Sequence, residues 1–197
     1  MIVTLIRHTS VAVAPGVCYG QSDVDVAGSF ADEAAGVRRR LGERRFDAVF
    51  SSPLKRCRKL AHYCGYAAPR VDARLMELDF GEWEMRAWEA IDDPQLTRWY
   101  ADWISEAPSG GESLRQLVAR VGDLVSELAG GCDAGNGANR SNAHERVAIF
   151  THAGVIRAWG AVLGLFAVEA AFEYKVDYGD VVDFTLPCPG TAPEERM

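Results

Sequence analysis

The chain has 197 residues, of which 48% are hydrophobic and 25% are charged, a balance typical of a globular protein that buries a sizeable core. This length suits one domain, or one domain with a small insertion. The net charge of −7 argues against a surface that binds nucleic acid or an acidic membrane, although it leaves room for a local basic pocket that binds an anion.

The cysteines and the N-terminal segment indicate the cellular environment. Five cysteines with no C-x-x-C pair predict reduced thiols rather than a disulfide framework or a zinc site. The apolar run at residues 2–6 is too short for a signal-peptide core or a membrane span, and no later segment is a better candidate. We therefore expect a cytoplasmic protein that does not act on membranes. Its oligomeric state is left open.

The first half of the chain predicts two strands, a helix and an insertion. Short apolar runs at residues 2–6 and 47–50 are typical of strands buried on both faces. Ser52 and Pro53 then favour a helix start, with serine as the N-cap and proline at the first helical position. Residues 78–110 depart from the strand–helix rhythm and contain a segment rich in tryptophan and acidic residues. We interpret them as a helical insertion that lies over the sheet.

The second half continues the alternation of helices and strands. Ser113 and Gln116 match a capping box at the start of a long helical pattern, and residues 146–150 predict a third buried strand followed by another helix. We interpret residues 130–145 as a surface loop and residues 187–197, with three prolines, as a frayed tail. The chain therefore predicts a single α/β domain at residues 1–186 with a mainly parallel sheet.

Reactive side chains follow all three predicted strands. Arg7 and His8 come directly after the first strand, Arg56 follows the second, and His152 follows the third. In open α/β sheets the carboxyl ends of the strands line the ligand crevice, and helix N-termini there direct free amides at anions. We therefore expect these four side chains to converge although they are far apart in the sequence.

Two arginines and two histidines are matched to a phosphate group. Arginine offers a rigid fork of donors for phosphate oxygens, and a neutral imidazole can attack phosphorus and hold the phosphoryl group. Nearby positive charge keeps that imidazole unprotonated. Glu77 is the candidate acid for the leaving oxygen, although it competes with neighbouring carboxylates at Asp79, Glu82 and Glu84.

Four motifs in order resemble the histidine phosphatase superfamily, which also includes the cofactor-dependent phosphoglycerate mutases. They are LIRH, SSPLKRC, RLMELDFGEWE and FTHAGVIR, and the resemblance extends over roughly residues 3–186. It implies a three-layer αβα sandwich whose insertion covers the active-site end. It also implies that His8 is the nucleophile, that Arg7 and Arg56 clamp the phosphate, that Glu77 is the acid and base, and that His152 is the second histidine. No metal or cofactor is expected.

Two further segments, CYGQSD and DFGEWEMR, are similar to α-ribazole-5′-phosphate phosphatases of cobalamin biosynthesis. This similarity makes α-ribazole 5′-phosphate the substrate expected first. The chain departs from the family pattern at Thr9, Val11 and Leu60, where glycine, threonine or serine, and threonine are common. These departures concern minor phosphate contacts and leave the charged residues intact.

Plainer interpretations remain for each residue. His8 could be a hydrogen-bonded core histidine, and Arg56 could be a surface arginine because Lys55, Arg58 and Lys59 surround it. The tryptophans at positions 83, 88, 99 and 103 are expected to serve packing more often than ligand contact. Two other functions also fit the sequence: a mutase-type phosphotransferase, and a regulatory protein that binds phosphate without turnover.

Overall fold

The computed structural model describes residues 1–130 and 146–187, and the predicted loop and tail therefore lie almost entirely outside the described residues. A five-stranded sheet forms the centre, in the order β3-β2-β4-β1-β5. Its strands are β1 (Ile2–Arg7), β2 (Ala48–Ser51), β3 (Arg70–Val71), β4 (Arg146–Thr151) and β5 (Val181–Thr185). The first four run parallel and β5 is antiparallel to β1. The three predicted strands are confirmed, and each continues one residue beyond its predicted end.

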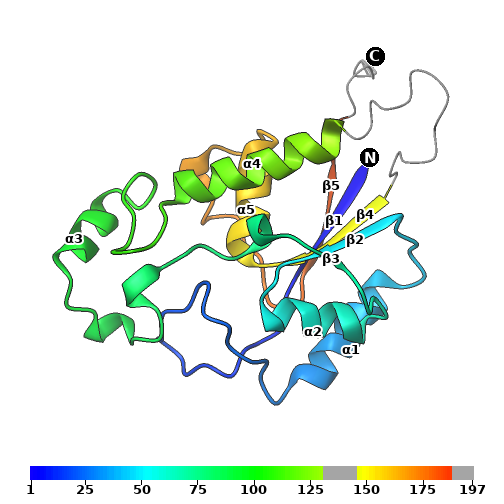
Figure 1. Cartoon of the computed structure of the whole chain (residues 1–197), viewed down its shortest axis with the longest axis horizontal. Coiled ribbons are helices and arrows are strands. Elements are labelled where there is room, and N and C mark those ends of the chain that lie inside the picture. Colours follow the sequence, from blue (N-terminus) through cyan, green and yellow to red (C-terminus); the bar gives the residue numbers. More distant parts are fainter. Residues whose placement is uncertain (131–145, 188–197) are drawn as a thin grey trace.

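Helices cover both faces of the sheet and make three layers, as predicted (Figure 1). The helices α1 (Phe30–Leu41) and α2 (Lys55–Tyr63) pack against one face, where Ile6 and Phe150 are buried. The helices α4 (Leu114–Gly130) and α5 (Ala153–Val162) pack against the other, over Leu5 and Ile149. Successive strand residues alternate between the faces, so a strand covered on both sides must be apolar at nearly every position.

The start of α4 follows the predicted capping box. The Ser113 amide donates to Gln116 Oε1 at 2.7 Å, and the Gln116 amide donates to Ser113 Oγ at 3.3 Å. Two amides of the first turn that have no partner inside the helix are thereby satisfied.

The predicted start of α2 is wrong by a few residues. The helix begins at Lys55, and Leu54 is its N-cap in an extended conformation. Ser52 Oγ does accept a hydrogen bond from the Leu54 amide at 3.3 Å, but it closes a turn between strand and helix instead of capping the helix. Pro53 lies in this turn, so its fixed φ shapes the connection and not the first helical turn.

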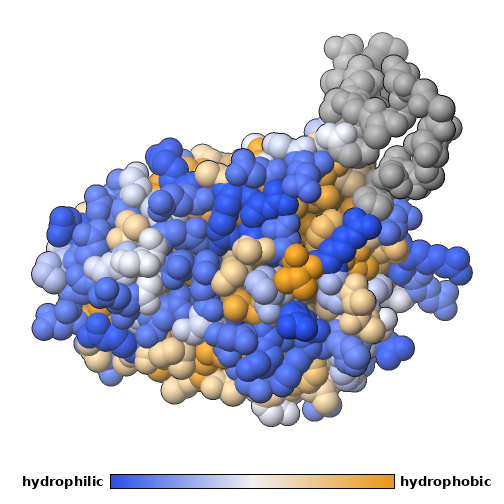
Figure 2. Space-filling view, viewed as in Figure 1, coloured by the Kyte–Doolittle hydropathy of each residue, from blue (hydrophilic) through white to orange (hydrophobic). Residues whose placement is uncertain are grey.

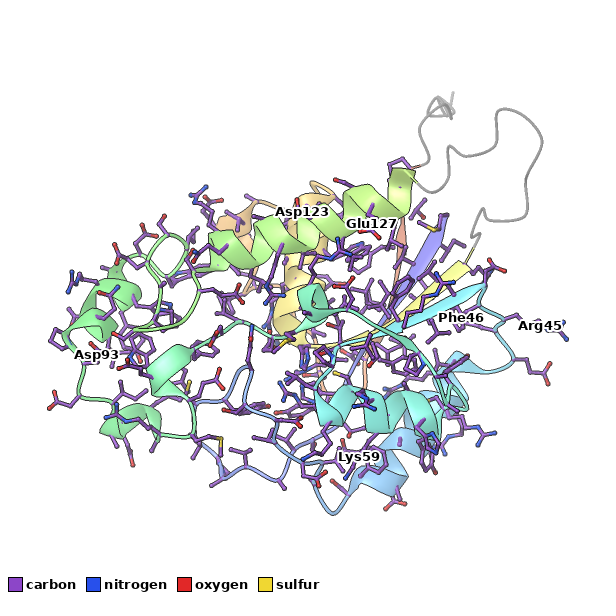
Figure 3. All side chains as sticks on the ribbon, viewed as in Figure 1. Arg45, Phe46, Lys59, Asp93, Asp123 and Glu127 are labelled. Atoms are coloured by element: carbon purple, nitrogen blue, oxygen red, sulfur yellow. The ribbon has the colours of Figure 1, made fainter. Side chains whose placement is uncertain are left out.

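The insertion is less helical than predicted. Between η1 (Ala73–Leu75) and α4 it holds two 3-10 turns, η2 (Gly81–Trp83) and η3 (Trp88–Ala90), and one α-helix, α3 (Pro94–Ala101). Asp93, labelled beside α3 in Figure 3, caps this helix by accepting from the Gln95 amide and also accepts from Trp83 Nε1. Trp83, Trp88 and Trp99 pack against one another, which confirms a packing role for these three.

The surface is mainly hydrophilic on the face drawn in Figure 2, with hydrophobic residues in small groups. Such scattered groups are normal for a globular surface. None of the helices in residues 1–130 and 146–187 is long and apolar enough to cross a bilayer.

Candidate active site

Strand pairing brings the reactive segments together at one edge of the sheet. Arg7 pairs with Thr151 in the β1–β4 ladder, so the residues that follow, His8 and His152, become neighbours. Their ring centroids lie 5.0 Å apart in an edge-to-face arrangement. The Ser52 amide donates to the Phe150 carbonyl at 2.9 Å, which brings the end of β2 to the same place. The predicted convergence at the carboxyl ends of the strands is therefore present.

The imidazole of His8 is held neutral with one nitrogen free. Its Nδ1 lies 2.7 Å from the Thr9 carbonyl oxygen, which can only accept, so Nδ1 carries the proton and Nε2 keeps its lone pair. The side chain is 1% exposed. Burial, with the charges of Arg56 and Arg7, holds the pKa of His8 well below its usual value, although the bond to Thr9 opposes this shift.

His152 has the opposite tautomer. Arg56 Nε, which can only donate, lies 3.3 Å from His152 Nδ1, so the proton of this neutral ring is on Nε2 and is donated to Ser52 Oγ at 2.9 Å. The side chain is completely buried. Burial and then the charges of Arg56 and His8 hold the pKa of His152 well below its usual value. The site thus contains two neutral imidazoles beside a permanent cation.

Arg56 is completely buried, so it is not the surface arginine of the plainer interpretation. Its Nη2 donates to the Gly20 carbonyl at 2.6 Å and its Nη1 donates to the Ser22 carbonyl at 2.9 Å. The loop that supplies these carbonyls is held by Glu84, whose carboxylate accepts from the backbone amides of Gln21 and Ser22. The basic neighbours of Arg56 remain on the surface. Arg56 alone among them turns inward, because the Gly20 and Ser22 carbonyls accept its hydrogen bonds there.

Arg7 is less completely bonded. Its Nη1 donates to the Val176 carbonyl at 2.6 Å, and its guanidinium lies 4.0 Å from the centre of the Tyr178 ring. Its Nε is buried and has no hydrogen-bond partner among the described residues. Because an unpaired buried donor costs free energy, Arg7 is poised to bind an acceptor that comes from outside the chain.

Two tyrosines that we did not predict as site residues cover the histidine. The hydroxyl oxygens of Tyr19 and Tyr178 lie 2.6 Å apart. The Tyr178 ring lies 5.6 Å from the His8 ring, and the Tyr19 ring lies 5.5 Å from the Arg56 guanidinium. Tyr178 lies in the turn before β5, where no motif marked it. His8 is almost fully buried beside this tyrosine pair.

Glu77 lines a cavity of about 210 Å³ beside this covered site. Its Oε1 accepts from the Leu78 amide at 2.9 Å, and its Oε2 accepts from the Gly154 amide at 3.3 Å, at the N-terminus of α5. The competing carboxylates of residues 79–84 do not line this cavity. The residues that do are Arg7, Tyr19, Glu77, Leu78, Phe80, Leu114, Leu117, Ala153, Gly154, Arg157, Ala171 and Phe172.

A paired arginine and glutamate hold the backbone of Glu77. Arg120 donates from Nη2 to the Glu77 carbonyl at 3.0 Å and from Nη1 to the Arg74 carbonyl at 2.6 Å. The carboxylate of Glu112 accepts from Arg120 Nε at 3.0 Å and pairs with its Nη2. Arg120 was not predicted, although its partner Glu112 directly precedes Ser113, the predicted capping residue of α4.

Cys57 does not compete as a nucleophile, although its sulfur lies 3.4 Å from His152 Nε2. A cysteine beside a histidine can form a reactive pair only if the thiol loses its proton. Burial raises the pKa of Cys57 to about 12, so the thiol is neutral.

Among the described residues we looked for side chains that could hold a metal ion and for other hollows. No three histidine, cysteine, aspartate or glutamate side chains gather there in a way that could hold a metal ion. A larger hollow of about 820 Å³ lies beside α2 between Phe30 and Val71, and none of the predicted site residues lines it.

Comparison with known proteins gives consistent results. A model of the histidine phosphatase superfamily, branch 1, matches residues 3–187. A glucosyl-3-phosphoglycerate phosphatase from Mycobacterium tuberculosis is 32% identical over 151 residues, which cover 73% of this chain and 66% of that protein. A metal-independent phosphoserine phosphatase from Arabidopsis thaliana is 30% identical over 168 residues, which cover 79% of this chain and 66% of that protein. The chain thus spans slightly less than two thirds of the length of these relatives.

Solved structures share the fold over nearly the whole chain. A native mycobacterial glucosyl-3-phosphoglycerate phosphatase has a TM-score of 0.77 and 26% identity, with coverage of 92% of this chain and 88% of that chain. The α-ribazole phosphatase from Shigella flexneri has a TM-score of 0.81 and 23% identity, with coverage of 93% and 89%. The second of these is a likeness of fold alone.

Proposed function

Because this chain belongs to the histidine phosphatase superfamily, branch 1, we propose that it is a phosphomonoesterase that passes a phosphoryl group through His8. The observation that carries this proposal is the state of His8. The ring is neutral, its Nδ1–H is held by the Thr9 carbonyl, and its Nε2 lone pair has no protein donor among the described residues. An imidazole prepared in this way can attack phosphorus without first losing a proton.

The surrounding groups have the chemistry to stabilise phosphoryl transfer. Arg7 has free donors, including its unpaired Nε, and Arg56 keeps part of its fork after its bonds to the loop carbonyls. Both offer fixed positive charge to the oxygens of the group being transferred. His152 donates its Nε2 proton to Ser52 Oγ, so it can donate to a phosphate oxygen only if its ring turns away from Ser52.

Glu77 gives a proton to the leaving oxygen and later takes one from the attacking water. In the first step the Nε2–P bond forms while the ester P–O bond breaks, and Glu77 gives its proton to the leaving alkoxide oxygen. In the second step water attacks the phosphohistidine, Glu77 takes the proton of that water, and the N–P bond breaks to release inorganic phosphate. This sequence returns His8 and Glu77 to their starting forms and needs no other reactant.

The site residues define the substrate less closely than they define the reaction. The motifs CYGQSD and DFGEWEMR favour α-ribazole 5′-phosphate, whereas the names of the matched relatives add glucosyl-3-phosphoglycerate and phosphoserine. All of these are small phosphomonoesters. A mutase-type transfer differs because it returns the phosphoryl group to a second hydroxyl, and release of inorganic phosphate without a bisphosphoglycerate primer would exclude it.

Replacing His8 by alanine tests the mechanism. We expect the rate of p-nitrophenyl phosphate hydrolysis to fall by several orders of magnitude, because the nucleophile is lost while the fold survives. An acid-labile phosphoenzyme should be trapped in the wild type and be absent from His8→Ala. His62→Ala, at a histidine near the end of α2, is the matched control and should keep wild-type turnover. Nearly unchanged turnover in His8→Ala would refute the mechanism.

A further inference from the structure

Arg157 is a cation in the cavity that the proposed mechanism does not use. It lies on α5 three residues after Gly154 and lines the same cavity as Arg7 and Glu77. Its Nε donates to the Tyr174 carbonyl at 3.1 Å, and its guanidinium lies 5.2 Å from the centre of the Phe172 ring. Within the described residues its two Nη groups have no hydrogen-bond acceptor, so the outer part of the fork is available to a ligand.

Glu77 lies close enough to attract Arg157 electrostatically, but among the described residues no hydrogen bond joins the two side chains. The two negative charges of a phosphomonoester match Arg7 and Arg56, and Glu77 is the single carboxylate among the residues that line the cavity. Glu77 must carry a proton when it acts as the acid, and it is then neutral. The nearby walls are apolar, with Leu78, Phe80 and the leucines of α4, and such surroundings strengthen the attraction between a cation and a bound anion.

We propose that Arg157 binds a carboxylate on the leaving group, so that the preferred substrates are phosphomonoesters of small hydroxy acids. A carboxylate fits better than a second phosphate because it brings one negative charge and a planar pair of oxygens, which suit one arginine fork. A second phosphate would bring up to two charges, and Arg157 is the single cation that remains for them among the residues lining the cavity.

The dimensions agree with a small substrate. Three residues of α-helix advance about 4.5 Å along the axis, so Arg157 lies one turn beyond the Gly154 amide where Glu77 is held. A carboxylate a few bonds from the ester oxygen can span that distance. A volume of about 210 Å³ is below the roughly 300–1,000 Å³ of pockets that enclose drug-sized ligands, so a nucleoside-sized leaving group would extend beyond the cavity.

Matched pairs of substrates test this inference, which rests on the proposed phosphatase function. The pair 3-phosphoglycerate and glycerol 3-phosphate differs in a carboxylate, as does the pair phosphoserine and phosphoethanolamine. We expect the wild type to have a higher kcat/KM on the acid of each pair. Arg157→Met keeps an apolar stem but removes the charge, and it should lower kcat/KM on the acids by about 10- to 100-fold, as for one lost charged hydrogen bond.

The controls separate recognition of the carboxylate from other roles. Arg157→Met should change kcat/KM on p-nitrophenyl phosphate and glycerol 3-phosphate by less than about threefold, because neither carries the carboxylate. Arg98→Met, at an exposed arginine of α3, should leave all substrates unchanged. Equal losses on both members of a pair would overturn the inference, since Arg157 would then act on the phosphate or through Glu77. An unchanged preference in Arg157→Met, or no preference in the wild type, would also overturn it.

Binding measurements keep the inference testable if turnover fails. His8→Ala removes the proposed nucleophile, and calorimetry on this variant compares 3-phosphoglycerate with glycerol 3-phosphate directly. Tighter binding of the acid that is lost in the double variant with Arg157→Met supports the carboxylate site even if the wild type hydrolyses neither ester. Equal affinities would refute the site. Should Arg157→Met fail to fold, Arg157→Lys keeps the charge without the fork and should retain only part of the preference.

Discussion

Replacing Glu77 by glutamine separates proton delivery from phosphate binding. The carboxylate accepts from the Leu78 amide at 2.9 Å and from the Gly154 amide at 3.3 Å. A glutamine side chain keeps the shorter contact through its carbonyl oxygen and turns its NH₂ group toward Gly154. One long hydrogen bond is lost, which costs about 0.5–1.5 kcal/mol of unfolding free energy. Since small domains are typically stable by about 5–15 kcal/mol, the variant should fold.

The effect on activity should depend on the leaving group. An alkoxide needs a proton as its bond to phosphorus breaks, and general acid catalysis contributes about 10²- to 10⁴-fold to such a step. We expect Glu77→Gln to lose activity in this range on glycerol 3-phosphate. A nitrophenolate is a good leaving group, so the loss on p-nitrophenyl phosphate should be about tenfold or less when phosphorylation of the enzyme limits the rate.

Steady-state kinetics on both substrates, with phosphate inhibition as a binding measurement, provide the assay. The inhibition constant for phosphate should stay near the wild-type value or fall slightly, because a negative charge near the bound anion is removed. Glu82→Gln is the matched control, since this carboxylate belongs to the same segment but is exposed. Equal losses on both substrates would refute the role of Glu77. If Glu82→Gln instead lost activity on glycerol 3-phosphate but not on p-nitrophenyl phosphate, the acid role would belong to Glu82.

Three further predictions address the metal, the phosphate clamp and pH. Activity should survive extended dialysis against EDTA, and a loss restored by one divalent ion would place the chemistry in another class. Arg56→Lys should lower kcat/KM by about 10²- to 10³-fold, because lysine keeps the charge but cannot bond two carbonyls and a phosphate together; a change below threefold would contradict this. The folded-state pKa of His8 and His152 lies below the unfolded value of 6.5, so the unfolded chain binds protons there first. Urea unfolding should therefore show stability falling as pH drops below about 6.5, by up to about 1.4 kcal/mol per pH unit for each imidazole, with a smaller slope in His152→Gln.

The sheet and the position of the site were predictable because local patterns marked them. Apolar runs marked the strands, and polar residues directly after those runs marked the edge where His8 and His152 meet. The capping box at Ser113 was predictable for the same reason, since both partners lie within one turn. When two residues that bond to each other lie within one turn of a helix, their spacing in the sequence predicts the bond.

The burial of Arg56 and the contact of Tyr178 with His8 depend on distant partners that no local pattern marks. Arg56 resembles its surface neighbours in the sequence, and only the carbonyls of the loop at residues 20–22 draw it into the interior. Tyr178 covers His8 because a turn far along the chain returns to β1. Arg157 had a usable signal, since it lies three residues after Gly154 on the same face of a predicted helix. Only the structure shows which cavity this face of the helix lines.

The strand order has a consequence for how the chain is made. Both neighbours of β1 in the sheet, β4 and β5, come late in the chain, so β1 leaves the ribosome well before either partner exists. At about 5–20 residues per second, translation leaves this strand waiting on the order of ten seconds. Until then both of its edges are open to wrong pairing with other chains, and such edges favour aggregation. A chain released before β5 would carry every residue that lines the cavity but would leave one edge of β1 unpaired. A chaperone that shields β1 during this interval should therefore raise the yield of correctly folded protein.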